Sequence, residues 1–329
     1  MRFALLTAVF SLAAAAHAAD LTVTGTVAGP DGGWDYASID GARNRLMVAR
    51  PDGLMVMDLA SRAITPAFVP GKRVHGAAIA PSGVGVLANG GGASALVFDA
   101  KDGSVLAEIP TGKKPDAVVY EPKSGLLAVM DNKDGGVALI DPDKKASAGS
   151  IEVGGALEFA VADGEGRIFV NVEDKSTLVV LDIPNRKVVA RRPLPDCDEP
   201  SGLALDPATH VLVSACANGK AIATSAIDGK VLATLPIGSH PDAVLFDEKH
   251  KRFLVPCGGE GVLTEISEKG SSLEVTGTVQ TAASVRLGAL DAATGKVYLP
   301  AADFQPAAKP GERPAIVPGT FRIMVLEAQ

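Results

Sequence analysis

A short apolar pattern that ends in an acidic or small residue recurs seven times along the 329-residue chain. The last residues of these patterns form one column, made up of Asp40, Ala80, Glu121, Asp163, Asp206, Asp247 and Asp291. Successive column positions are 40 to 44 residues apart, a period typical of proteins in which each repeat is one four-stranded sheet. This period restricts the chain to an array of seven similar units.

Short β-rich segments separated by polar turns fill each unit, and no segment outside the N-terminus keeps a helical period for long. Second strands are predicted at 45–49, 126–130, 167–172, 211–216, 252–257 and 296–300, and fourth strands at 104–110, 187–193, 230–236 and 273–280. The seventh unit stops after its third strand, at 321–326, so its fourth strand must come from elsewhere.

The missing strand is predicted at 21–28, because Val-Thr-Gly-Thr-Val occurs twice, at 23–27 and at 275–279. The second copy lies in a fourth strand, whereas the first stands alone before the first unit. Pairing 21–28 beside the C-terminal strand would cover two sheet edges at once. The predicted fold class is therefore all-β, a seven-bladed β-propeller closed by its N-terminal strand.

The units resemble the YVTN β-propeller repeat. The resemblance is carried by Pro-Asp-Ala-Val at 115–118 and 241–244, by Pro-Ser-Gly-Leu at 200–203 and by the segment 167–182, and it extends over essentially the whole chain after the leader. It implies a periplasmic or surface-exposed binding protein. The family includes reported nucleic-acid binders, and its fold is shared with amine dehydrogenase large subunits and lactonase-type enzymes.

Residues 1–18 read as a cleaved signal peptide, with Arg2, a short apolar run and the small-x-small sequence Ala16-His17-Ala18. The remaining residues, 19–329, are expected to form a single seven-bladed propeller domain in the periplasm, with a proline-rich loop at 301–319 and no membrane span. The formal net charge is −7 and aromatic residues make up only 4% of the chain, which argues against a nucleic-acid partner. A monomer is expected.

One face of the propeller is predicted to carry the function, because loops that lead into the first strands and loops between second and third strands emerge there. The candidate ligand-binding residues on these loops are Trp34, Tyr36, Arg50, His75, Asp116, Asp131, Asn171, His240, Asp242 and Arg286. The proline-rich segment 301–319 leaves the same face and favours an extended arm, either a lid or a docking arm for a partner.

The chain has three cysteines, an odd number for an exported protein. Antiparallel pairing within the fifth unit would place Cys216 near Cys197, which allows a disulfide. Alternatively, Cys197, Cys216, His240 and Cys257 are candidate ligands for zinc or copper(I). Cys257 also fits a small buried apolar position.

Two functions follow. The first is a non-enzymatic binding protein that holds a small polar ligand, a peptide or a partner protein on the loop-rich face. The alternative is a metal-dependent enzyme, a lactonase-like hydrolase or redox accessory protein, with its ion held by Asp116, Glu158, Asn171 and Asp242. No catalytic residue or cofactor is assigned, because no nucleophile motif is present.

Overall fold

The structure is a computed structural model, and it describes residues 21–269, 272–306 and 314–328. The predicted signal peptide, residues 1–18, lies outside these residues, as do residues 307–313 of the proline-rich segment. Within the described residues, no helix is long and apolar enough to cross a membrane.

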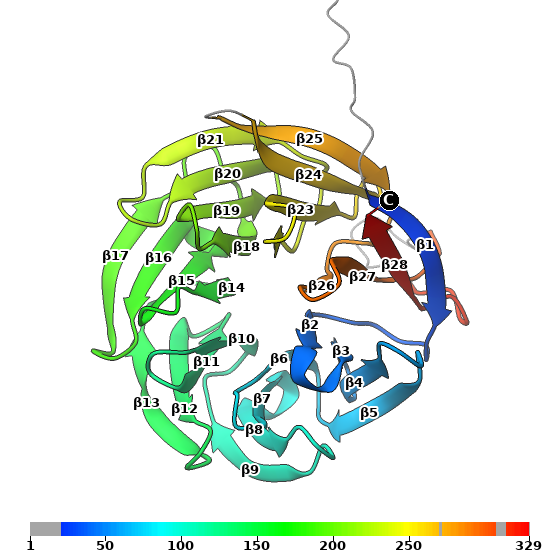
Figure 1. Ribbon diagram of the computed structural model, residues 1–329. Coiled ribbons are helices and arrows are strands. Elements are labelled where there is room, and N and C mark those ends of the chain that lie inside the picture. Colours follow the sequence, from blue (N-terminus) through cyan, green and yellow to red (C-terminus); the bar gives the residue numbers. More distant parts are fainter. Residues whose placement is uncertain (1–20, 270–271, 307–313, 329) are drawn as a thin grey trace, which may run out of the picture.

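The chain forms a ring of seven four-stranded antiparallel sheets, or blades (Figure 1). Blade 1 consists of β2 (Ala37–Asp40), β3 (Arg45–Arg50), β4 (Gly53–Asp58) and β5 (Ile64–Pro70), and blade 2 of β6 (Val74–Ile79), β7 (Val84–Asn89), β8 (Ser94–Asp99) and β9 (Val105–Pro110). Blade 3 consists of β10 (Pro115–Glu121), β11 (Leu126–Asp131), β12 (Gly136–Asp141) and β13 (Ala146–Glu152), and blade 4 of β14 (Leu157–Ala162), β15 (Arg167–Val172), β16 (Thr177–Asp182) and β17 (Lys187–Pro193). Blade 5 consists of β18 (Pro200–Asp206), β19 (Val211–Cys216), β20 (Lys220–Ser225) and β21 (Val231–Pro236), and blade 6 of β22 (Leu245–Asp247), β23 (Arg252–Cys257), β24 (Val262–Lys269) and β25 (Ser272–Gln280). Short 3-10 helices form the turns η1 (Gly41–Arg43), η2 (Gly90–Gly92) and η3 (Glu173–Lys175).

Blade 7 joins the two ends of the described chain. It consists of β26 (Ala289–Asp291), β27 (Lys296–Ala301), β28 (Arg322–Ala328) and, as its outermost strand, β1 (Leu21–Ala28). The strand β1 pairs antiparallel with β28 from Leu21 opposite Ala328 to Ala28 opposite Arg322, and the two strands lie side by side in Figure 1. The seven-bladed all-β fold predicted from the repeat is confirmed, and the N-terminal strand completes the last blade.

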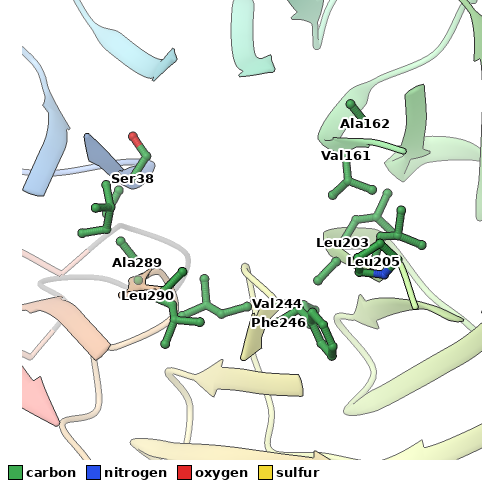
Figure 2. A pocket seen from close by; sticks show the side chains of 16 residues that line it. Ser38, Val161, Ala162, Leu203, Leu205, Val244, Phe246, Ala289 and Leu290 are labelled. Carbon is green, nitrogen blue, oxygen red and sulfur yellow. The ribbon is translucent and has the colours of Figure 1, made fainter. Parts of the chain in front are cut away.

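The innermost strands surround a central cavity of about 400 Å³ (Figure 2). Its walls are mainly apolar and come from blades 1, 4, 5, 6 and 7, with Ile39, Val161, Leu203, Phe246 and Leu290 among them. These residues lie beyond the first residues of the innermost strands. The polar groups described below are at the starts of those strands and therefore lie at one end of this cavity.

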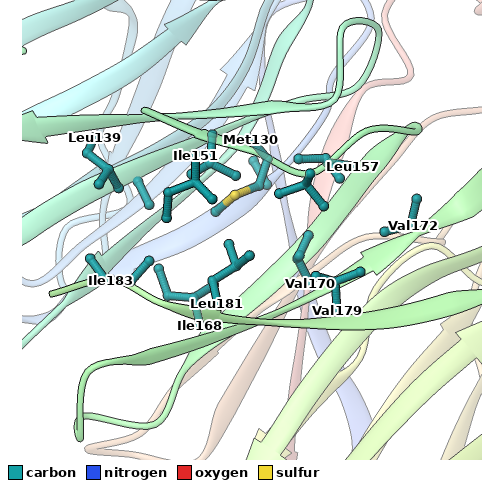
Figure 3. Close-up of a cluster of buried hydrophobic side chains, with 14 residues drawn as sticks. Met130, Leu139, Ile151, Leu157, Ile168, Val170, Val172, Val179, Leu181 and Ile183 are labelled. Carbon is teal, nitrogen blue, oxygen red and sulfur yellow. The ribbon is translucent and has the colours of Figure 1, made fainter. Parts of the chain in front are cut away.

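The hydrophobic core lies between neighbouring blades rather than at the centre of the ring. Figure 3 shows one such cluster between blades 3 and 4, in which Met130 and Ile151 face Ile168 and Leu181. These side chains are 3% exposed or less. Second and third strands are buried on both faces, which explains their continuous apolar sequences. Packing between blades therefore makes the ring a stiff frame for the loops that it carries.

Candidate functional site at the pore mouth

Seven equivalent positions surround the pore where the innermost strands begin. Each lies five residues before its column residue, and together these positions are Asp35, His75, Asp116, Glu158, Ser201, Asp242 and Arg286. The start of an innermost strand pairs with the end of the second strand, as Pro115 does with Asp131. The seven residues, which we call the mouth ring, therefore lie on the face predicted from the loop directions.

Irregular pairing sets the direction of four side chains of the mouth ring. The register between first and second strands shifts between Val74 and Ala77, between Pro115 and Val118, between Leu157 and Ala160, and between Pro200 and Leu203. His75, Asp116, Glu158 and Ser201 each fall inside one of these shifts. A bulge of this kind releases a residue from the ladder and redirects its side chain.

His75 lies between two carboxylates from neighbouring blades. Its Nδ1 atom is 2.7 Å from Oδ2 of Asp35 and 3.2 Å from Oδ1 of Asp116. One ligand atom from each residue lies within 4.8 Å of the other two. The Asp116 side chain is 5% exposed and that of Asp35 is 29% exposed, so solvent reaches the cluster from the blade 1 side.

A second polar cluster connects blades 1, 3 and 4. Lys114 Nζ donates to Oδ1 of Asn132 at 2.7 Å, and Asn132 Nδ2 donates to Oε1 of Glu158 at 2.5 Å. The Tyr36 hydroxyl donates to the other oxygen of Glu158 at 3.4 Å. The ring of Tyr36 packs on Phe159, with ring centroids 4.3 Å apart. Both oxygens of Glu158 are therefore held in place.

Burial and mutual repulsion raise the pKa values of the mouth carboxylates. Burial and then the charge of Asp35 raise the pKa of Asp116 to about 7, although His75 favours its ionised form. Burial also raises the pKa of Glu158 to about 9, with Asp116 as the next cause. Burial and the surrounding carboxylates raise the pKa of Tyr36 well above its usual value.

The remaining acid of the mouth ring is Asp242, whose Oδ2 atom lies 3.2 Å from Nε of Arg286. Burial raises the pKa of Asp242 to about 6 although Arg286 favours its ionised form. Lys114 also favours ionisation of Asp242 and Glu158. These two cations do not balance the four acids, so negative charge accumulates at the mouth when the acids ionise.

Five of the predicted ligand-binding residues therefore lie at the mouth: Tyr36, His75, Asp116, Asp242 and Arg286. The structure brings these together, and their role in ligand binding stays a prediction. The other five lie away from the mouth ring or have their polar groups engaged by the protein.

Trp34 and Arg50 belong to the packing around the proline-rich segment. Trp34 contacts Phe321 and Phe304, with ring centroids 5.3 and 6.3 Å apart. Arg50 is 3% exposed, and its Nη2 atom donates to the carbonyls of Pro30, Asp31 and Gly32. Both side chains thus fix the loop between β1 and β2.

The described ends of the proline-rich segment 301–319 pair with each other. Phe304 forms a bridge with Ile316, and the amide of Gln305 donates to the carbonyl of Ala315 at 2.8 Å. The arm predicted from the sequence therefore leaves the face as a hairpin-like base, and its residues 307–313 lie outside the described residues.

Asp131 and Asn171 have buried structural roles. Asp131 accepts hydrogen bonds from the amides of Lys114, Lys133 and Asp134. Asn171 is fully buried and links two blades.

The Asn171 Nδ2 atom donates to the carbonyls of Ser201 and Gly202 at 3.1 and 3.0 Å, and the Asn171 Oδ1 atom accepts from Ser214 Oγ at 3.0 Å. Because both ends of the Asn171 amide are engaged, this residue does not join Asp116, Glu158 and Asp242 in the ligand set considered for a metal-dependent enzyme.

The cysteines do not assemble with His240 into a thiolate site. Cys197 and Cys216 are joined by a disulfide, the pair that the sequence allows. Cys257 is a buried free thiol, and burial raises its pKa to about 11. His240 is exposed. Among the described residues, the group that could hold a metal ion is instead Asp35, His75 and Asp116.

Asp35, Lys114 and Asn132 are missing from the sequence-based list of ligand-binding residues, and Glu158 entered only the enzyme alternative. All four lie on the predicted loops, but loop membership alone does not separate residues that face the pore from those that brace the blades. The missed signal is the constant offset of five residues from the column, which selects Asp35 and Glu158 and passes over Trp34 and Arg50.

Comparisons with known proteins identify the fold and no family. No protein-family model matches the chain, and no curated protein matches it. The chain is similar in structure to the hydrazine synthase of Kuenenia stuttgartiensis, with a TM-score of 0.71 and 15% identity over 84% of this chain and 95% of that chain.

A chain in a crystal structure of the mitotic checkpoint complex is also similar, with a TM-score of 0.75 and 11% identity over 98% of this chain and 97% of that chain. At these identities the likeness extends to the fold alone. The seven-bladed propeller fits a scaffold for binding or interaction, and the chemistry has to be argued from the mouth itself.

Proposed function

We propose that this chain is an exported, periplasmic binding protein with YVTN-type repeats that holds a small, positively charged ligand at its mouth ring. In this proposal the protein acts as a monomer and the ligand leaves unchanged. The sequence predicts a small polar ligand, and this proposal adds that the ligand carries a positive charge.

The observation that carries the proposal is the composition of the mouth ring. Four of its seven positions are acidic, namely Asp35, Asp116, Glu158 and Asp242, whereas only Arg286 carries a fixed positive charge. Opposite charge within a few ångströms stabilises an ionised carboxylate, and a ligand cation would supply that charge. An anionic ligand would instead meet repulsion from most of the ring.

The fixed placement of these groups supports binding of a ligand without a chemical reaction. The acids come from separate blades of a stiff ring, and several are fixed by hydrogen bonds such as that from Asn132 to Glu158. Polar groups that are held in place lose little freedom when a ligand binds. Below the mouth, the cavity of about 400 Å³ has apolar walls, so the charged groups that select a ligand are confined to its rim.

The test is isothermal titration calorimetry of the purified protein at low ionic strength with three probes. The cations are 1,4-diaminobutane and Co²⁺, and succinate is the anionic counterpart of the diamine. We expect at least one cation to bind and succinate not to bind. Because Asp242 belongs to the mouth ring and its pKa of about 6 leaves it ionised at neutral pH, Asp242→Asn should weaken binding of the diamine or of any organic cation at least about tenfold.

Asp143→Asn is the matched control, since Asp143 is an exposed carboxylate in the turn between β12 and β13, on the opposite face. Its affinity should equal that of the unmodified protein. Absence of binding by both cations, or tighter binding of succinate, would contradict the proposed function.

A further inference from the structure

We propose that Asp35, His75 and Asp116 form a binding site for a divalent first-row transition metal ion. This inference rests on the proposed function and names a ligand class for the same mouth. It differs from the thiolate site and from the enzyme site considered from the sequence, because it uses one imidazole and two carboxylates from three consecutive blades.

The spacing of the donor atoms fits a shared cation. Nδ1 of His75 is 2.7 Å from the nearest oxygen of Asp35 and 3.2 Å from that of Asp116. Ligands bound at about 2.1 Å and roughly at right angles to each other lie about 3 Å apart. All three ligand atoms lie within 4.8 Å of one another, so they could bind one ion once the two carboxylate oxygens adjust their separation.

The hydrogen bonding of Asp116 provides a second, independent observation. Its side chain is 5% exposed, yet among the described residues no backbone or side-chain group outside this cluster donates a hydrogen bond to it. Other buried carboxylates of this fold accept amide hydrogen bonds from their own turns; these include Asp40, Glu121, Asp131, Asp206, Asp247 and Asp291.

A buried carboxylate without such donors is costly unless a cation or proton compensates it. The fold therefore leaves Asp116 beside His75 without the amide hydrogen bonds that it gives to these six buried acids.

Backbone contacts hold the three ligands together. The amide of Asp35 donates to the carbonyl of Ala49 at 3.0 Å, and the amide of Tyr36 donates to the carbonyl of His75 at 3.1 Å. At Gly76 an added Cβ would lie 2.8 Å from the carbonyl oxygen of Asp116. Blades 1, 2 and 3 are thus locked to each other beside the ligands, which is the preorganisation that a metal site needs.

The donor types identify the metal class. Imidazole suits zinc, copper, iron and nickel, whereas carboxylates also suit manganese and magnesium, so one imidazole with two carboxylates favours a first-row divalent ion. Two ionised carboxylates balance the charge of that ion. Three protein ligands leave at least one coordination position open for water or a small ligand.

To test this site, metal is first removed from the protein by chelator and dialysis. The protein is then titrated with Co²⁺, whose visible absorption reports its ligands and coordination number. We expect one Co²⁺ per chain and a visible spectrum that differs from that of aqueous Co²⁺. His75→Gln, Asp35→Asn and Asp116→Asn should each lower Co²⁺ affinity by at least about 100-fold, the upper range for loss of a group that only supports a metal ligand.

Asp143→Asn is the matched control, because it removes an exposed carboxylate on the opposite face of the propeller and should change Co²⁺ affinity less than about threefold. Circular dichroism verifies folding of each variant. If Asp116→Asn does not fold, Asp35→Asn tests the site in its place, because Asp35 is the most exposed of the proposed carboxylate ligands. Equal losses in Asp143→Asn and in the ligand variants, or no stoichiometric Co²⁺, would overturn the site. Binding of 1,4-diaminobutane alone would uphold the proposed function while refuting the metal site, and absence of both cations would refute both.

Discussion

Glu158 is a mouth acid whose ionisation the fold opposes, since burial and then the charge of Asp116 raise its pKa from 4.5 to about 9. Between these two values the folded protein holds a proton that the unfolded chain has released. Stability that is present below about pH 4.5 is therefore lost as the pH rises toward 9, by up to about 1.4 kcal/mol per pH unit.

Glu158→Gln removes this proton linkage and keeps the shape of the side chain. We expect the variant to be more stable than the unmodified protein by at least about 1 kcal/mol at pH 8, with a flatter dependence of unfolding free energy on pH. Urea unfolding at pH 5, 6.5 and 8 measures both quantities. The exposed control Asp143→Asn should keep the original pH dependence, and parallel curves for Glu158→Gln and the unmodified protein would show that Glu158 ionises freely in the fold.

The sequence identifies the face of the site better than its members. Tyr36 and Asp116 could be predicted because they lie at the starts of strands that the repeat locates. Trp34 could not be separated from them, since its packing on Phe304 depends on a segment that departs from the repeat. The bulge at Asp116 also interrupts strand alternation, so side-chain direction at that point does not follow from the apolar pattern.

At the scale of elements, the strands could be predicted almost to the residue. The predicted segments 167–172, 211–216 and 252–257 match β15, β19 and β23, because a strand buried on both faces gives a continuous apolar run bounded by polar turns. The proline-rich segment between β27 and β28 could not be predicted in the same way. Its described ends are fixed by tertiary contacts such as the Phe304–Ile316 bridge, which leave no periodic signal.

The disulfide constrains one element, the loop that leads into β18 and toward Ser201. Cys197 and Cys216 are 19 residues apart in sequence, and closing a loop of about this length stabilises a fold by about 3 kcal/mol through the unfolded chain. We expect the double substitution Cys197→Ala and Cys216→Ala to lower the free energy of unfolding by about that amount. Urea unfolding without reductant measures the loss.

Cys257→Ala is the matched control for this element, because it removes a buried thiol that is in no disulfide. It should cost at least about 2 kcal/mol less than the double variant. Adding reductant to the unmodified protein should reproduce most of the double variant's loss, and an unchanged unfolding curve under reduction would contradict the assigned contribution.

At the scale of the whole molecule, the ring depends on one strand that is distant in sequence from the blade it completes. The strand β1 covers the edge of β28, and its Leu21 side chain is only 1% exposed in the core between blades 6 and 7. Without β1, the backbone groups of β28 would form an open edge and Leu21 would leave a gap in the core. A chain that starts at Gly29 should therefore lose stability far beyond the cost of one side chain.

We expect this shortened chain to unfold without a single cooperative transition or to associate through its open edge, and a synthetic peptide of residues 21–28 to restore a monomer with one transition. Size-exclusion chromatography and thermal unfolding with and without the peptide measure both effects. A peptide with the same composition in scrambled order should not restore the fold, because Leu21 packs in the cluster toward blade 6 and Val27 against the cluster toward blade 1, and both contacts depend on the order of residues. If the shortened chain alone unfolds cooperatively at the original temperature, blade 7 is stable with three strands and the ring does not depend on its N-terminal strand.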